Sequence, residues 1–292
     1  LFRSAMSMEI RLLTSQIGAE IFGVDASRPL ADDTIAGLRR ALLQHLVIFL
    51  RDQALTPEVQ LSFARHFGEP DTYPFVRGLE GHPEITPVLK GADETVNFGG
   101  IWHSDTSYLP EPPMATVLYA RELPAVGGDT LFANQYLAYE TLSPPLRQFL
   151  DGLTAINSAG KGVASATRTH RIDDTGDGVD DEDMRAEHPA VRRHPETGRR
   201  ALFVNVGHTV RFKDMTEAES EPILDYLFRH QVRPEFCCRF RWQPGSLALW
   251  DNRCAQHNPV NDYHGYRREL HRITLKGDRP RGPGQGSMNM EA

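Results

Sequence analysis

The order in which helical and extended patterns follow one another most constrains the fold of this chain. Helical patterns cluster early, whereas extended segments dominate the middle and the end. Helices and strands do not alternate regularly, and no Gly-x-Gly-x-x-Gly motif follows a predicted strand. This order disfavours a doubly wound nucleotide-binding fold. It predicts a mainly β protein with flanking helices, built as a β-sandwich or a barrel.

Capping signals and apolar spacing place the predicted elements. Thr56 before Pro57 predicts a helix start, and Gly68 is expected to close that helix. Thr216 and Glu219 form a predicted capping box ahead of an apolar run. The remaining predictions are a helix over 35–46 with Asp32, Asp33 and Thr34 as N-cap candidates, a short helix over 143–150, and strands over 47–50, 115–119, 129–132, 237–242, 246–250 and 271–276.

Charge and cysteine content exclude several kinds of partner and compartment. The net charge of -7 offers no basic excess to neutralise phosphates, so nucleic acid is not an expected partner. No run of about 18 apolar residues predicts a membrane span, and no signal peptide is visible at the start. Three cysteines, two of them adjacent, do not form a disulfide framework. We therefore expect a protein of the reducing cytoplasm.

Composition along the chain suggests one domain with variable ends. Residues 8–280 are expected to form a single domain, with 1–7 as a cloning remnant or disordered start and 281–292 as a disordered tail. Segment 158–188 is rich in aspartate and poor in apolar residues. It fits either a solvated acidic loop or a mobile lid over a site.

Two histidines and one aspartate are candidate metal ligands. His103 and Asp105 are two residues apart, so on a strand their side chains would face the same side. With a further histidine they would form the two-His-one-carboxylate triad that suits Fe(II). About one His-x-Asp is expected by chance among 12 histidines. His257, beyond a predicted strand, is the further candidate, although a lone histidine there also fits a surface or core residue.

Two arginines near the end of the chain suggest an anionic ligand. Arg268 and Arg272 are four residues apart, with Leu270 between them, so all three would share one face of a strand. Inward-facing guanidinium groups require anionic partners. A small dicarboxylate would provide them through bidentate hydrogen bonds. Pairing with Asp262 or Glu269, or exposure to solvent, is the alternative.

With these residues in this order, the chain resembles the taurine and 2,4-dichlorophenoxyacetate dioxygenase family, whose members are Fe(II)- and 2-oxoglutarate-dependent oxygenases. The resemblance runs from about Ile10 to Pro280. It rests on the order and spacing of linked segments: Ile17-Gly18-Ala19-Glu20-Ile21, Gly23-Val24-Asp25, Phe67-Gly68-Glu69-Pro70, Trp102-His103-Ser104-Asp105, Gly127-Gly128-Asp129-Thr130, Trp250-Asp251-Asn252-Arg253 leading to His257, and Arg268 through Arg272 with Gly277-Asp278-Arg279-Pro280.

The resemblance implies a double-stranded β-helix, that is, a cupin-like jelly roll, and it implies roles for individual residues. His103, Asp105 and His257 match the iron ligands and thereby the catalytic centre. Thr130 and Arg268 match residues that bind 2-oxoglutarate, and Arg272 matches an arginine that contacts either the cosubstrate or an anionic substrate. Trp250 matches an aromatic wall, although core packing explains it equally well.

The implied reaction uses Fe(II), 2-oxoglutarate and O2. Decarboxylation to succinate and CO2 is coupled to hydroxylation of an unactivated C–H bond. Related halogenases replace the metal-binding carboxylate with a small residue, so the presence of Asp105 favours hydroxylation over halogenation.

The substrate is expected to be a small organic acid with an apolar body. In taurine-metabolising relatives a histidine after the Phe-Gly-Glu motif contacts the sulfonate, and an asparagine lies four residues before the first iron-binding histidine. Here residues 70–75 contain no histidine, and position 99 is Gly. Taurine is therefore not the expected substrate. The candidate pocket residues, which also fit the core or a subunit contact, are Tyr73, Phe75, Phe98, Ile101, Tyr108 and Trp250.

Two other kinds of protein remain as alternatives. A hydrolase or isomerase could hold Zn²⁺ or Mn²⁺ with the same residues, but it would not need the pair of arginines. A catalytically inactive binding protein of the same fold would not need an intact ligand set. Relatives of this family commonly self-associate, so a homodimer or homotetramer is expected.

Overall fold

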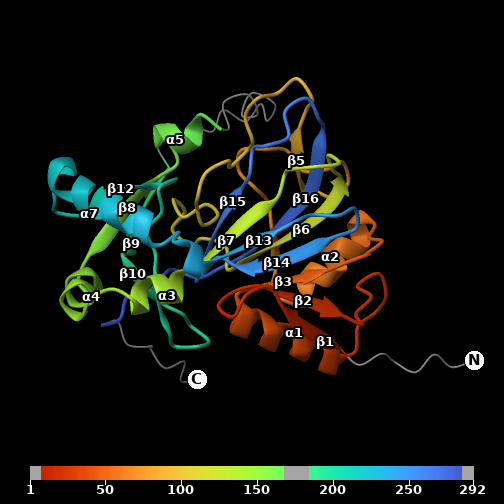
Figure 1. Ribbon diagram of the computed structural model, residues 1–292, viewed down its shortest axis with the longest axis horizontal. Coiled ribbons are helices and arrows are strands. Elements are labelled where there is room, and N and C mark those ends of the chain that lie inside the picture. Colours follow the sequence, from red (N-terminus) through yellow and green to blue (C-terminus); the bar gives the residue numbers. More distant parts are fainter. Residues whose placement is uncertain (1–7, 168–183, 285–292) are drawn as a thin grey trace, which may run out of the picture.

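The computed structural model describes residues 8–167 and 184–284, and it confirms the mainly β architecture as a cupin-like jelly roll (Figure 1). Its main sheet has the strand order β1-β2-β3-β14-β6-β16-β4, and β5 also pairs with β16. A smaller sheet, β13-β7-β15, faces it. The strands of these sheets are β1 Glu9–Leu12, β2 Ala19–Phe22, β3 Val47–Leu50, β4 Pro70–Asp71, β5 Thr86–Lys90, β6 Ala115–Glu122, β7 Thr130–Asn134, β13 Cys237–Phe240, β14 Leu247–Asp251, β15 Ala255–Pro259 and β16 Arg268–Leu275.

The core between the two sheets is aromatic. Phe49 of β3 stacks on Phe240 of β13 with ring centroids 3.8 Å apart and meets Phe132 of β7 edge-on at 5.6 Å. Trp250 of β14 also meets Phe132 edge-on, at 5.6 Å. Because such pairs add to the burial of large apolar side chains, they fix the distance between the sheets and hence the position of the residues on their inner faces.

Helices at the N-terminal end cover the outer face of the main sheet (Figure 1). Helices α1, Asp32–His45, and α2, Pro57–Arg65, contribute Leu38, Leu42 and Leu61 to a core shared with Ile48 and Leu50 of β3. The alternate β3 residues belong to the inter-sheet core. Both faces of β3 are therefore buried, which explains why its run of four apolar residues predicted a strand correctly.

The helix caps confirm some sequence predictions and correct others. Thr56 accepts a hydrogen bond from the Val59 amide, and the capping box of Thr216 with Glu219 is formed in both directions. The first helix is present as predicted, but its predicted N-cap residues were wrong, because the N-cap is Ala31 and no side chain caps it. Gly68 does not close α2, whose C-cap is His66. The position of Gly68 instead reflects close packing, since a Cβ there would lie 3.3 Å from Met114 Sδ.

A second lobe extends from the jelly roll on the side away from α2, at the left of Figure 1. Here β12-β8-β9 and β10-β11 form small sheets around a separate apolar core. The prediction of a loop over 158–188 was wrong at its ends, because helix α5 and the first residues of β9, which begins at Arg185, lie within this segment. The elements of this lobe are α3 Gln135–Glu140, α4 Pro144–Asp151, β8 Thr154–Ser158, α5 Gly162–Ser165, β9 Arg185–Pro189, β10 Val191–Arg193, β11 Arg200–Leu202, β12 Thr209–Phe212 and α7 Glu217–His230.

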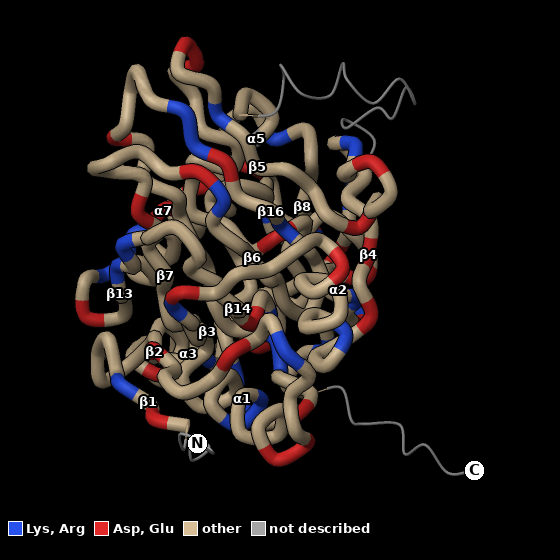
Figure 2. Tube along the Cα trace, turned by 90° about the vertical axis from the view of Figure 1, so that its right-hand side faces the viewer, with Lys and Arg blue, Asp and Glu red and all other residues tan. Residues whose placement is uncertain are grey.

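Some predictions concern residues that the structure does not describe. Residues 168–183, the middle of the predicted lid, residues 1–7, and residues 285–292 of the predicted tail 281–292 lie outside the described residues. The start of that tail is described, and the Arg281 carbonyl accepts a hydrogen bond from the Arg193 amide at 2.8 Å. Among the described helices, none has the length and apolar character needed to cross a membrane. Lys and Arg are interspersed with Asp and Glu over the visible side of the molecule (Figure 2), in keeping with the modest net charge.

Candidate functional site

The jelly roll brings His103, Asp105 and His257 together, so that their ligand atoms all lie within 4.8 Å of one another. His103 Nε2 is 3.7 Å from Asp105 Oδ1, and the two imidazole centroids are 4.2 Å apart. The local structure differs from the sequence prediction. Asp105 lies in a turn and not two residues along a strand, and His257 lies inside β15 and not beyond a strand.

Backbone hydrogen bonds hold the two histidines next to each other. The His103 amide donates to the His257 carbonyl at 3.1 Å, and the His257 amide donates back to His103 at 2.9 Å. Thr106 follows with a φ of 40°, in the left-handed region, as the chain turns away. The bridge and the turn together place the carboxylate of Asp105 beside both imidazoles.

The protonation of the cluster suits a divalent metal. His103 Nδ1 lies 2.6 Å from the Ile101 carbonyl oxygen and therefore carries the proton, which leaves the lone pair on Nε2. Burial lowers the pKa of His257 to about 3, so this imidazole stays neutral. Burial alone would raise the pKa of Asp105, but interactions with His257, His103 and Arg272 outweigh it and hold that pKa below its usual range. Two neutral imidazoles and one carboxylate are the donor set described for non-haem Fe(II).

A chain of buried hydrogen bonds orients the Asp105 carboxylate. Thr116 of β6 donates its hydroxyl to Asp105 Oδ2 at 2.6 Å and accepts from Asn252 Nδ2 at 2.8 Å. The indole of Trp250 donates to Asn252 Oδ1 at 2.9 Å, which fixes the orientation of the amide. Oδ2 is thus occupied, and Oδ1 is left to face the histidines. Sequence reasoning missed Thr116 and Asn252, although Asn252 lies in a quoted motif.

Two adjoining cavities meet at this cluster. The first cavity is lined by Tyr73, Phe98, Gly99, Ile101, His103, Asp105, Thr106, Tyr108, Thr167, His208 and Arg272. The second cavity is lined by Val88, Phe98, Gly99, His103, Leu118, Thr130, Trp250, His257, Pro259, Arg268 and Arg272. Of these residues, Gly99, Thr106, Thr167 and His208 were not predicted for the first cavity.

The second cavity contains polar groups suited to a carboxylate. Arg268 is 4% exposed, and its Nε and Nη2 atoms have no hydrogen-bond partner within the described chain. Thr130 Oγ1 accepts from the Trp242 indole at 2.9 Å, so its own proton remains available to a ligand. Trp250, predicted as a wall of the substrate pocket, lines this second cavity and also packs in the core, 4.7 Å from His257.

The first cavity combines aromatic walls with Arg272. The Arg272 guanidinium carbon lies 4.3 Å from the ring centroid of Tyr73 and 5.6 Å from that of Phe98. Nη1 is 3.4 Å from Asp105 Oδ1, while Nε and Nη2 have no hydrogen-bond partner among residues 8–167 and 184–284. The prediction for Phe75 was wrong: this ring does not line the cavity but packs behind Tyr73 and Tyr108 at 5.7 and 5.9 Å.

His208 is the least expected residue of the first cavity. Its amide donates to Asn205 Oδ1 at 2.8 Å, which fixes the Asn205 amide so that Nδ2 donates to Ser107 Oγ at 2.9 Å. Ser107 Oγ is in turn 2.9 Å from His208 Nδ1. No local signal could have identified this histidine, because Ser107 lies far from it in the sequence.

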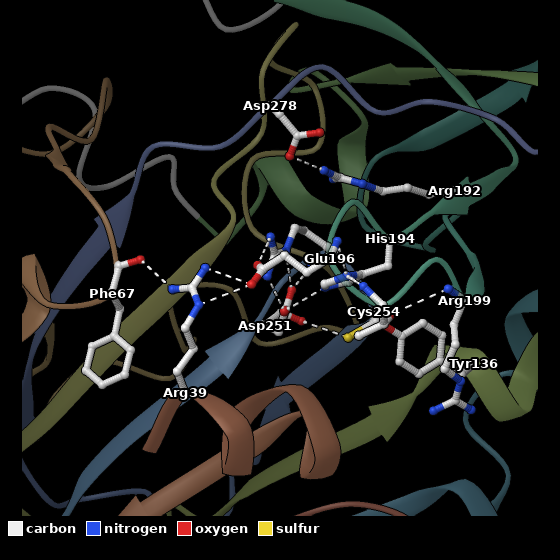
Figure 3. A network of polar contacts seen from close by, with 12 residues as sticks. Arg39, Phe67, Tyr136, Arg192, His194, Glu196, Arg199, Asp251, Cys254 and Asp278 are labelled. Atoms are coloured by element: carbon white, nitrogen blue, oxygen red, sulfur yellow. Dashed lines mark hydrogen bonds and ion pairs between the residues drawn. The ribbon is translucent and has the colours of Figure 1, made fainter. Parts of the chain in front are cut away.

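A second group of potential metal-binding side chains serves a different purpose (Figure 3). His194, Asp251 and Cys254 also lie within 4.8 Å of one another. However, Arg253 donates to both carboxylate oxygens of Asp251, at 2.8 and 2.6 Å. His194 Nε2 is 3.0 Å from Asp251 Oδ2, and its Nδ1 accepts two backbone amides. These groups satisfy one another, so we interpret the network as structural.

The network in Figure 3 connects three parts of the fold. Glu196 binds Arg253 at 2.8 Å and Arg39 of α1 at 2.8 Å. Asp251 ends β14, directly before Asn252, which supports the metal-binding cluster. The ion pairs therefore fix the end of β14 against the second lobe and α1, and with it the orientation of Asn252.

The residues present fit a metal and a dicarboxylate cosubstrate. Burying guanidinium nitrogens without hydrogen-bond partners is unfavourable, yet Arg268 and Arg272 are both buried beside the His/Asp cluster, and two nitrogens of each have no partner among the described residues. A ligand that supplies carboxylate oxygens would satisfy them. The same cluster could hold the metal that such a ligand chelates.

Comparison with known proteins agrees with this site. The model of the family described as "Taurine catabolism dioxygenase TauD, TfdA family" matches residues 9–274. The chain is 35% identical over 288 residues to an alpha-ketoglutarate-dependent sulfate ester dioxygenase of Pseudomonas putida, covering 95% of this chain and 92% of that protein.

Solved structures of similar proteins point to the same family. A taurine dioxygenase from Burkholderia xenovorans superposes with a TM-score of 0.81 at 38% identity, covering 95% of this chain and 93% of that one. AAD-2 in complex with Mn(II) and N-oxalylglycine superposes with a TM-score of 0.76 at 26% identity, covering 94% and 99%. The protein described here therefore belongs to the TauD/TfdA family of 2-oxoglutarate-dependent dioxygenases.

Proposed function

We propose that this protein is an Fe(II)- and 2-oxoglutarate-dependent dioxygenase that hydroxylates a C–H bond of a small organic anion with an apolar body. Succinate and CO2 are the products from the cosubstrate. The observation that carries the proposal is the pair of buried guanidinium groups, Arg268 and Arg272, on one strand beside a cluster of two histidines and a carboxylate. A metal-dependent hydrolase or isomerase would have no use for this pair, and neither would an inactive binding protein.

The chain's residues divide the work of the reaction. His103, Asp105 and His257 would hold the iron, which when bound activates O2 for the oxidative decarboxylation of 2-oxoglutarate. Arg268 and the Thr130 hydroxyl would bind the carboxylate of the cosubstrate that is far from the metal. Arg272, which lines both cavities, would bind the anionic group of the substrate. The aromatic walls keep water from the reacting carbon.

The charge of the site favours an anionic substrate. Among the groups that line the two cavities, an ionised Asp105, a divalent metal, the guanidinium groups of Arg268 and Arg272 and a doubly charged cosubstrate together leave an excess of positive charge. A buried charge requires a counter-charge, and a sulfate monoester, a sulfonate or a carboxylate provides one. Because a Pseudomonas putida relative is a sulfate ester dioxygenase, an alkyl or aryl sulfate ester is the preferred member of this class.

The lining of the first cavity disfavours taurine. Taurine carries an ammonium group, and Asp105 is the only acidic residue that the structure describes in this cavity. Since Asp105 would be bound to the metal, the described lining of this cavity offers no other carboxylate to the ammonium group. The rings of Tyr73, Phe98 and Tyr108 instead offer apolar surface to a hydrocarbon or aryl body.

Two measurements test the function. Under anaerobic conditions, Fe(II) and 2-oxoglutarate should give the visible charge-transfer band of the chelate, whereas a zinc hydrolase or an inactive scaffold stays colourless. With O2, succinate release should be stimulated by hexyl sulfate more than by taurine or hexanol. Absence of the band refutes the assigned chemistry, and a preference for hexanol refutes the anionic substrate.

We also propose that the protein acts as a homodimer or homotetramer in the cytoplasm. The three cysteines, Cys237, Cys238 and Cys254, are all free thiols, which fits a reducing compartment. Light scattering coupled to size exclusion would test the oligomeric state, and a monomer would contradict it.

A further inference from the structure

A lysine lies beside the arginine of the second cavity. Lys90, the last residue of β5, pairs directly with Arg268 of β16 across the antiparallel ladder. Directly opposed residues project from the same face of a sheet, and like charges in such pairs are destabilising. Lys90 is 2% exposed and Arg268 is 4% exposed. Two cations are therefore buried side by side.

The nearby carboxylates make their direct contacts with other groups. Asp129 binds Arg239 at 2.6 Å, and Asp262 lies 3.5 Å from the same guanidinium group. Asp262 also accepts the Gly128 amide at 2.7 Å. Within the described residues, Lys90 Nζ has no hydrogen-bond partner, and neither do two nitrogens of Arg268. These atoms therefore remain available to an anionic ligand.

Tyr263 compensates part of the charge. Its ring centroid is 4.4 Å from Lys90 Nζ and 5.7 Å from the guanidinium carbon of Arg268. Its hydroxyl donates to Asn97 Oδ1 at 2.6 Å. An aromatic face attracts cations, but it does not replace the oxygen acceptors that an ammonium and a guanidinium group require. Among the described residues, no carboxylate is paired with Lys90 Nζ.

We propose that Lys90 provides a second positive charge for the far carboxylate of 2-oxoglutarate, beside Arg268 and Thr130. This inference rests on the proposed function. Lys90 is not among the residues that line the second cavity, so it acts by its charge from beside Arg268. It is a positioning residue for the cosubstrate and not a catalytic residue.

The register of the strands supports a dicarboxylate. Thr130 of β7 is opposite Pro259 of β15, two residues from His257, and two residues of a strand span about 7 Å. The metal-binding cluster and the cationic group are therefore separated along the same cavity. A ligand that uses both needs a chelating group and a distant carboxylate on one short chain, which a monoacid does not have.

The test compares two ligands in two variants. In anaerobic titrations of the Fe(II)-loaded protein, the charge-transfer band reports the dissociation constants of 2-oxoglutarate and of 2-oxovalerate, which chelates but lacks the far carboxylate. We expect Lys90→Met to weaken 2-oxoglutarate binding at least about tenfold, because a buried positive charge near the far carboxylate is lost. Binding of 2-oxovalerate should change less than about twofold, because the ligand lacks the interacting group. Lys90→Arg should restore the affinity for 2-oxoglutarate.

The matched control is Lys276→Met, which removes an exposed lysine that binds Glu69 and should leave both constants unchanged. If Lys90→Met weakens the binding of both ligands equally, the role of Lys90 is purely structural and the proposal is overturned. Unchanged binding of both ligands overturns it as well.

If Lys90→Met does not fold, Lys90→Gln and Lys90→Arg are compared instead. Equal affinities of these two variants for 2-oxoglutarate overturn the proposal. Absence of the band in the wild-type protein would instead refute the proposed function.

Discussion

Replacement of Thr116 by valine tests whether the hydrogen bonds around Asp105 tune the metal site. The substitution keeps the shape of the side chain but removes the hydroxyl that donates to Asp105 Oδ2 and accepts from Asn252 Nδ2. All three residues are buried, at 0–2% exposure. Oδ2 would lose its donor, and the Asn252 amide would lose its acceptor. The carboxylate would then be free to rotate away from the histidines.

The expected effect is large enough to measure. A hydrogen bond to a charged group contributes about 1.5–3 kcal/mol. Loss of an outer partner of a metal ligand lowers metal affinity about 10- to 100-fold, which corresponds to about 1.4–2.7 kcal/mol. The two estimates agree, so we expect Thr116→Val to bind Mn(II) about 10- to 100-fold more weakly than the wild type.

The assay is a titration of Mn(II) followed by the electron paramagnetic resonance signal of the free ion. Thr274→Val is the matched control, because Thr274 is the direct neighbour of Thr116 on β16 and its side chain makes no hydrogen bond in the part of the chain that the structure describes. The control should keep wild-type affinity. A folded Thr116→Val variant with unchanged affinity, or an equal loss in the control, would refute the reasoning.

Three further predictions follow from individual contacts. Trp242→Phe removes the donor to Thr130 and should raise the dissociation constant of 2-oxoglutarate about two- to tenfold, measured by the anaerobic band; an unchanged constant would contradict this role. Asp251→Asn breaks the buried pair with Arg253 and should lower the free energy of unfolding by about 3–5 kcal/mol in urea, whereas a loss below about 1 kcal/mol would mark the pair as dispensable. Burial lowers the pKa of His188 to about 4, so between pH 6.5 and 4 the unfolded chain binds a proton that the folded chain does not. The free energy of unfolding should therefore fall by up to about 3 kcal/mol as the pH decreases through this window. The His188→Gln variant should show a smaller fall.

The sequence predicts this fold best where local patterns coincide with burial. The run Val47–Leu50 is buried on both faces, and the Thr216 capping box depends on residues only three apart, so both were predicted correctly. The short β15 was missed because its sequence, Ala-Gln-His-Asn-Pro, has no apolar alternation. As a result, His257 was identified as a candidate ligand while its local structure was predicted wrongly.

Residues that act through distant partners were the hardest to predict. Thr116 matters only because Asp105 and Asn252 converge on it, and Lys90 matters only because the strand register places it opposite Arg268. Pairing partners far apart in the sequence leave no local signal. Phe75 shows the converse error, since an aromatic residue near a motif belongs to the core as readily as to a pocket.

The reciprocal backbone hydrogen bonds between His103 and His257 determine how the protein gains and loses its metal. The backbone pairing itself holds the two histidines side by side, although they lie far apart in the sequence. Metal binding is therefore not needed to bring them together. The ion can therefore leave and return without unfolding the protein. Metal depletion should abolish turnover while leaving the far-ultraviolet circular dichroism unchanged, and activity should return on simple addition of Fe(II).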